Sequence, residues 1–149
     1  MVFGRRSRIR RCPVNSSEER RRADMGVIRR LTCPSCQKEW QLRLGHGMRH
    51  GVLGRVMEVF SEDIQREIAA DVNTEQLSLF HFNYRTALCR KCRSVEAVPV
   101  LHLMESGRSY IGACPVCGGE VELLDEDSRI VCPACERDEL NEQETGHWD

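Results

Sequence analysis

Eight cysteines of this sequence are spaced as four Cys-x-x-Cys pairs: Cys33 with Cys36, Cys89 with Cys92, Cys114 with Cys117, and Cys132 with Cys135. On a tight turn, two cysteines at this spacing direct both sulfurs to one point about 2.3 Å away, and two such turns complete a tetrahedron around a metal ion. Proline follows the first cysteine in three pairs, and Gly118 follows the second cysteine in one. Both residue types favour such a turn. Four pairs therefore predict two structural metal sites.

Zinc is the expected metal, as two Zn²⁺ ions, although sulfur quartets also bind iron. The chain is 40% hydrophobic and 30% charged, so its apolar core must be small and metal binding would supply folding free energy. It has no apolar run of about 18 residues and no secretory signal, which predicts a cytoplasmic protein with reduced thiols and no membrane association. Redox catalysis usually places one Cys-x-x-Cys pair at a helix start. No strand-helix-strand pattern surrounds any of these pairs, so metal binding is favoured over redox catalysis.

The four pairs can form two sites in three ways. Sequential pairing would join Cys33, Cys36, Cys89 and Cys92 in one site and the remaining four cysteines in the other. The short acidic turn between the last two pairs favours this arrangement, and spacing alone leaves a nested and a crossed arrangement open. With sequential pairing, the helical segment is an insertion inside the first unit.

The predicted organisation has four parts. Residues 1–24 are expected to form a disordered basic arm, unless translation starts at Met25 and the arm is not made. Residues 25–105 would form the first metal unit with a helical insertion at 46–73, residues 106–135 the second unit, and residues 136–149 an acidic disordered tail. Residues 1–30 carry a formal charge of +7 and residues 118–149 carry −9, so the two ends differ strongly in charge.

Hydrophobic periodicity predicts the elements between these ends. Alternation of Trp40, Leu42 and Leu44 marks a strand with one buried face. A helical stretch follows, in which Ser61 or Asp63 can cap a turn that places Ile64 and Ile68 on one face. Further strands are expected over 77–88, 95–104, 110–113, 120–124 and 129–131.

Three features beyond the cysteines could carry chemistry. Gly45–Gly51 contains His46 and His50, which could hold phosphate or a third metal, but a strand-to-helix hinge is the favoured interpretation. Phe80, Phe82 and Tyr84 alternate, which is more typical of a core face than of a base-stacking platform. Basic side chains lie in one cysteine turn and could contact nucleic acid or offset the charge of the metal site itself: Arg90, Lys91 and Arg93.

The cysteine turns resemble the zinc-ribbon superfamily, with its rubredoxin-like four-cysteine knuckles, over 108–135 and over 27–44 with 80–104. The order of the elements also resembles small uncharacterised bacterial zinc-ribbon proteins. This resemblance implies a small α+β, metal-stabilised fold with two zinc-ribbon β-hairpin units and a short helical insertion in the first. Gln37, Arg93 and Glu136 stand where the commonest knuckle has glycine, so three turns depart from that pattern.

The resemblance supplies no settled activity, because zinc ribbons serve many functions. The leading hypothesis is a non-enzymatic zinc protein that acts as an adaptor, binding a protein or nucleoprotein assembly. The first alternative is direct nucleic-acid binding in transcription or replication, through the arginine-rich arm and the basic cysteine turn. The second alternative is an enzyme that uses His46 and His50.

Overall fold

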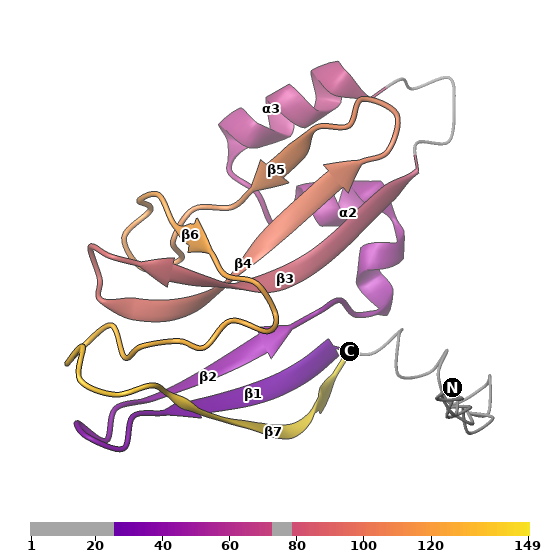
Figure 1. Ribbon diagram of the computed structural model, residues 1–149. Helices are drawn as coiled ribbons and strands as arrows, with labels where there is room; N and C mark the ends of the chain where they lie inside the picture. The colour runs from indigo at the N-terminus through magenta and orange to yellow at the C-terminus, as the bar shows by residue number, and fades with distance from the viewer. Residues whose placement is uncertain (1–25, 73–78) are drawn as a thin grey trace, which may run out of the picture.

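The computed structural model describes residues 26–72 and 79–149, which form two antiparallel sheets and a few short helices (Figure 1). The expected small α+β class is therefore confirmed. The basic arm over 1–24 and the alternative start at Met25 lie outside the described residues. No helix in the described ranges is long and apolar enough to cross a membrane.

Sheet 1 consists of β2 (Glu39–Leu44), β1 (Gly26–Thr32) and β7 (Asn141–Trp148), in that order. β1 is central and pairs antiparallel with both neighbours. The expectation of a disordered tail over 136–149 is wrong, because β7 forms an edge strand along the whole of β1. Periodicity could not indicate β7, since nearly all of its side chains are exposed and polar.

Trp148 fixes the far end of β7. Its indole Nε1 donates a hydrogen bond to the carbonyl of Leu44 at 3.0 Å. Its ring also covers Gly26 so closely that a Cβ there would lie 2.3 Å from ring atoms. A side chain at position 26 would displace the ring, so this glycine allows β7 to close on β1.

Sheet 2 has the order β5 (Ser109–Ile111), β4 (Ser94–Leu103), β3 (Phe80–Cys89) and β6 (Glu122–Leu123). β3 and β4 form a long hairpin, paired from Phe80 with Leu103 to Cys89 with Ser94. The strand expected over 120–124 is reduced to β6, and the one expected over 129–131 is reduced to a single bridge between Val131 and Glu139. Short strands suffice there because the cysteine turns beside them fix the chain.

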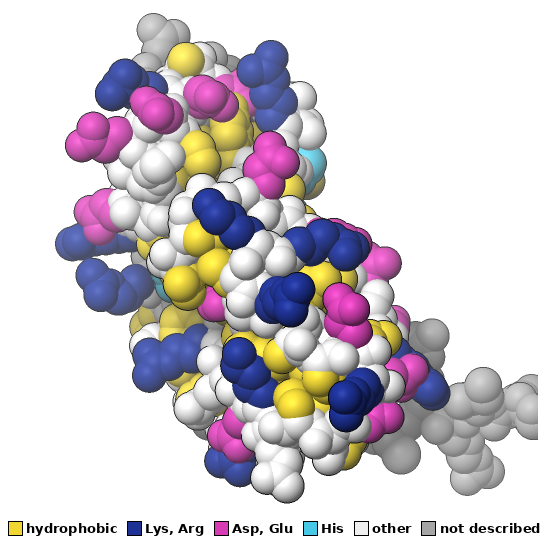
Figure 2. All heavy atoms as spheres, turned by 90° about the vertical axis from the view of Figure 1, so that its left-hand side faces the viewer, with side chains coloured by type: hydrophobic (Ala, Val, Ile, Leu, Met, Phe, Trp, Pro, Cys, Tyr) yellow, Lys and Arg dark blue, Asp and Glu magenta, His cyan; other side chains and the backbone are white. Residues whose placement is uncertain are grey.

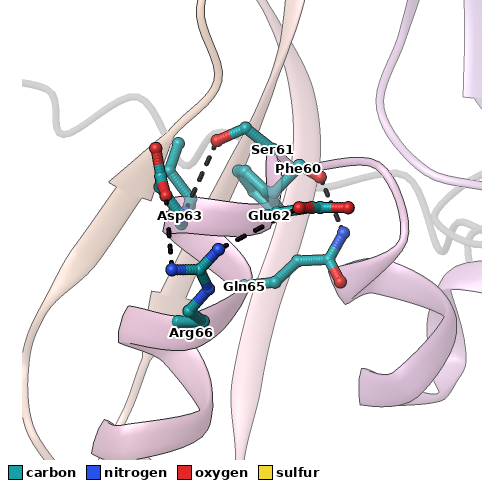
Figure 3. A network of polar contacts seen from close by, with 7 residues as sticks. Phe60, Ser61, Glu62, Asp63, Gln65 and Arg66 are labelled. Atoms are coloured by element: carbon teal, nitrogen blue, oxygen red, sulfur yellow. Dashed lines mark hydrogen bonds and ion pairs between the residues drawn. The ribbon is translucent and has the colours of Figure 1, made fainter.

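Between β2 and β3, the described part of the chain forms three helical segments: η1 (Met48–Gly51), α2 (Leu53–Met57) and α3 (Glu62–Asp71). Ser61 caps α3, as predicted, by accepting a hydrogen bond from the Ile64 amide at 3.4 Å. Figure 3 shows the polar contacts around this start, where Gln65 Nε2 donates to the Phe60 carbonyl at 2.8 Å. Arg66 reaches back to Glu62 and Asp63, two carboxylates that also favour the positive end of the helix dipole.

The residues that the structure describes form two hydrophobic cores. The first core lies between sheet 1 and the nearer end of sheet 2, and consists of Leu31, Cys33, Leu42, Leu44, Val95, Ile130, Cys132 and Leu140. The second core lies where the helices cover one face of sheet 2, and consists of Val56, Phe60, Ile68, Phe82, Leu101, Leu103 and Tyr110. Of the two, the first is the one that contains cysteines.

Gly45 joins the two sheets. Its backbone has a positive φ of 85°, a conformation that glycine adopts without strain. Its amide donates to the Tyr84 carbonyl at 2.9 Å, and the Tyr84 amide donates back at 2.7 Å. The chain therefore leaves sheet 1 at Gly45 already hydrogen-bonded to the middle of sheet 2.

Candidate metal centres

The eight predicted cysteines meet in two groups of four. Site 1 consists of Cys33, Cys36, Cys132 and Cys135. Site 2 consists of Cys89, Cys92, Cys114 and Cys117. The favoured sequential pairing is therefore wrong, and the nested arrangement is the one that the structure adopts. The boundary between units at residues 105 and 106 rested on sequential pairing and loses its basis.

Site 1 is assembled by strand pairing in sheet 1. The β1–β2 hairpin carries Cys33 and Cys36 in its turn. β7 pairs with β1 from Asn141, opposite Thr32, so the chain just before β7 arrives beside that turn. That preceding chain carries the fourth cysteine pair. The ladder that sequence periodicity missed is thus the reason why the last cysteine pair joins the first.

Site 2 is assembled in the same way in sheet 2. The β3–β4 hairpin carries Cys89 and Cys92 in its turn. After β5 the chain runs back along β4, where the Gly112 amide donates to the Pro99 carbonyl at 2.8 Å, and delivers the third cysteine pair to that turn. β6 then pairs with the end of β3.

The sulfur spacing in both sites fits a tetrahedral metal. In site 1 the Sγ atoms of Cys33 and Cys135 lie 3.5 Å apart, and those of Cys36 and Cys132 lie 3.7 Å apart. In site 2 the Sγ atoms of Cys89 and Cys117 lie 3.6 Å apart, and those of Cys92 and Cys114 lie 4.0 Å apart. Four sulfurs at about 2.3 Å from a central ion would be about 3.8 Å from one another. Both groups could therefore hold a metal ion with little movement of the chain.

No family model, curated protein or solved structure matches the chain.

The metal centres therefore rest on their own geometry, and the backbone supports them at each turn. The residue after the second cysteine has a positive φ in all four turns: 60° at Gln37, 51° at Arg93, 71° at Gly118 and 57° at Glu136. Among the described residues, the three that are not glycine are the only non-glycine residues with positive φ. The departure from the knuckle sequence pattern is thus not a departure from knuckle geometry. Such strain persists where surrounding contacts fix the backbone, and here the turn must place two sulfurs.

Within each pair the first cysteine is buried and the second lies nearer the surface. Backbone amides also point at sulfur, as in the 3.5 Å contact from the Cys36 amide to Cys33 Sγ and the 3.4 Å contact from the Cys92 amide to Cys89 Sγ. Hydrogen bonds of this kind favour the charged form of the sulfur. The first cysteines thus tie the site to the protein interior, while the second ones complete the shell from outside.

Crowding of the sulfurs opposes the ionisation of Cys92 and Cys36. The contact with Cys117, together with partial burial and further contacts with Cys89 and Cys114, raises the pKa of Cys92 to about 12. The Lys38 amide lowers the pKa of Cys36, but partial burial and the three neighbouring thiols outweigh it and raise that pKa to about 11. A metal ion must displace these protons, so its binding strengthens as pH rises and weakens in acid.

The two histidines of the Gly45–Gly51 loop point to different surroundings. His46 Nδ1 lies 2.8 Å from Asn83 Oδ1. His50 Nδ1 accepts a hydrogen bond from the Gly47 amide at 3.0 Å, and its ring packs 4.7 Å from that of Phe82. Burial is the main cause that lowers the pKa of His50. His50 is therefore engaged in packing and loop closure.

The aromatic residues of β3 serve the core, as the favoured interpretation predicts. Phe82 is buried in the second core, and Phe80 and Tyr84 pack against it. A contact that sequence reasoning missed lies at site 1, where the Ser35 hydroxyl donates to Asp138 Oδ2 and links the two cysteine turns. No sequence signal identified this pair, because it depends on the nested arrangement.

Double substitutions can test the nested arrangement directly, with serine in place of the more accessible cysteines. Because Cys36 and Cys135 share a site, the variant carrying Cys36→Ser and Cys135→Ser should keep one metal ion by native mass spectrometry. The variant carrying Cys36→Ser and Cys92→Ser damages both sites and should keep none. Sequential pairing predicts the reverse result. Crossed pairing predicts that only Cys36→Ser with Cys117→Ser spares one ion.

Glycine substitution should relieve the strained turns. Gln37→Gly and Glu136→Gly each place glycine at a positive φ, so each should stabilise the metal-bound protein by about 1 kcal/mol. Gly118→Ala makes the opposite change at the same position of a different turn, with no atom near the added methyl, and should destabilise by a similar amount. Thermal melting at fixed metal concentration measures the three shifts. Destabilisation by both glycine variants would show that the original side chains, not the turns, set the stability.

Proposed function

We propose that the chain is a structural zinc protein whose two four-cysteine sites hold one Zn²⁺ each. The observation that carries this proposal is the near-tetrahedral spacing of sulfurs in both sites. Zinc suits a closed set of four thiolates, since it has no redox chemistry and accepts tetrahedral geometry without preference from d electrons. The residues that would hold it are the eight cysteines of sites 1 and 2, and its role would be to stabilise the fold.

Metal removal should unfold the protein and not merely empty the sites. Native mass spectrometry of the purified chain should show two zinc ions. Acidification or a strong chelator should remove both ions, and the low charge states of the compact protein should disappear with them. Far-ultraviolet circular dichroism should lose strand signal in parallel and recover when Zn²⁺ is restored. Iron in the native spectrum would replace zinc in the proposal. A chelated protein that keeps its strand signal would remove the structural role.

The second part of the proposal is a non-enzymatic role as an adaptor that binds a protein assembly through the cysteine turns. Figure 2 views the end of the molecule where the turns of β1–β2 and β3–β4 lie, and shows hydrophobic side chains exposed among separate Lys and Arg side chains. Val116, in one cysteine turn, is 71% exposed, and Val131, next to another, is 52% exposed. Apolar side chains within a polar rim are typical of protein contact surfaces.

Charge also favours a protein partner over bare nucleic acid. The formal charge of the chain is −1, and two zinc tetrathiolates of −2 each would take it to about −5. Arg90 is already paired with Glu122 at 2.8 Å. The alternative of nucleic-acid binding is favoured by one observation, the five exposed basic side chains of the cysteine turns: Lys38, Arg90, Lys91, Arg93 and Arg137.

The absence of catalysis in this proposal is supported by the surroundings of the two loop histidines. His50 is held by Gly47 and by aromatic packing, and His46 contacts an amide side chain. If the purified protein turned over a substrate, and His46→Ala abolished that activity while folding was preserved, the enzymatic alternative would be restored.

Photo-crosslinking inside cells tests the partner class. A photoreactive residue at position 116 or 131 should give an adduct with the same protein from both positions. The matched control is position 69, an exposed alanine on α3 in the helical part, which should give none. Adducts removed by nuclease would establish the nucleic-acid alternative, and purified protein would then bind single-stranded or duplex DNA with an affinity that falls by about 10²-fold or more between about 50 and 200 mM salt. No adduct at either turn position would contradict the adaptor role.

A further inference from the structure

The face of sheet 2 that points away from the helices carries histidines. Phe82 and Leu101 are buried on the helix-covered face, so their neighbours in sequence point to the other one. These neighbours include His81 on β3 and His102 on β4, of which the first is exposed and the second is partly exposed. Neither residue takes part in the cysteine sites.

His81 and His102 lie directly opposite each other in the antiparallel register. The 3.0 Å hydrogen bond from the Met104 amide to the Leu79 carbonyl continues the same ladder beyond them. Side chains directly opposite on one face of such a pair have Cβ atoms about 4.5–5.5 Å apart. Two imidazoles at this separation can turn toward one ion and bind it at about 2.0–2.1 Å from nitrogen.

The neighbouring strand orients one of the two rings. His102 Nδ1 lies 2.8 Å from the hydroxyl of Ser109, which stands opposite His102 on β5. When Nδ1–H donates to this hydroxyl, Nε2 keeps its lone pair and faces outward as a ligand. Histidines that bind metals are held in this way, with the second ring nitrogen hydrogen-bonded to a protein group.

We propose that His81 and His102 form a third metal site, for a divalent transition-metal ion that prefers imidazole, such as Ni²⁺ or Zn²⁺. With two protein ligands, the remaining coordination positions are open to water or to a group from another molecule. The site differs from the cysteine sites in ligand chemistry and in exposure. It binds reversibly and does not contribute to the fold.

Nickel binding to the zinc-loaded full chain tests this site. Ni²⁺ is the probe because it suits imidazole ligands. Isothermal titration should show one equivalent bound, and native mass spectrometry should show one nickel beside two retained zinc ions. His81→Ala and His102→Ala should each weaken nickel binding at least about tenfold. His147→Ala is the matched control, since this exposed histidine lies on β7 in the other sheet, and it should leave the affinity unchanged.

The site would be overturned by absence of nickel binding to the zinc-loaded chain, by unchanged affinity in both His81→Ala and His102→Ala, or by an equal loss in His147→Ala. Nickel that appears only with loss of zinc would also overturn it, because the ion would then occupy cysteines. The zinc count in the same spectrum keeps this outcome separate from the proposed structural zinc, since each proposal predicts its own number of ions.

Discussion

Closure of a four-sulfur cluster requires turns that are far apart in the chain to meet within a few ångströms. In site 1 the sulfur contacts join residues separated by 102 and 96 positions, whereas in site 2 the separations are 28 and 22. The entropy lost on closing a loop grows with its length, so site 1 is the harder one to form. The β1–β7 ladder offsets that loss, because its backbone hydrogen bonds and the Trp148 contact hold the last cysteine turn beside the first. A metal ion in site 1 and the β1–β7 ladder would therefore support each other.

The two cores differ in their cysteine content. Cys33 and Cys132 are fully buried members of the first core, in contact with aliphatic side chains from both sheets. A metal ion bound by these thiolates would hold the turns together. The second core is closed by α2 and α3 over β3 and β4 and has no cysteine, so ordinary apolar burial stabilises it. Gly45 and its paired hydrogen bonds with Tyr84 connect sheet 1, which carries site 1, to sheet 2, which carries site 2.

Local features could be predicted from the sequence, but their long-range pairing could not. Cysteine spacing identified every member of the two sulfur groups, alternation identified the buried face of β3, and the Ser61 cap followed from its side chain. The nested arrangement could not be predicted, because it depends on β7, whose exposed polar residues carry no periodicity. The positive φ of Gln37, Arg93 and Glu136 was hidden for a related reason. A positive φ that tertiary contacts enforce on a non-glycine residue cannot be recognised from the sequence, because no glycine stands at that position.

Basic side chains in the cysteine turns would have a local electrostatic role if both sites hold zinc. Each zinc tetrathiolate would carry −2, and Coulomb attraction favours cations placed within a few ångströms of it. Lys38 and Arg137 belong to the turns of site 1, while Arg90, Lys91 and Arg93 belong to one turn of site 2. Glu122 on β6 in turn engages Arg90, so part of this positive charge is balanced from the other side. Basic residues in these positions would offset the negative charge of the zinc tetrathiolates, whereas the exposed apolar side chains beside them, such as Val116, have no such role in the fold.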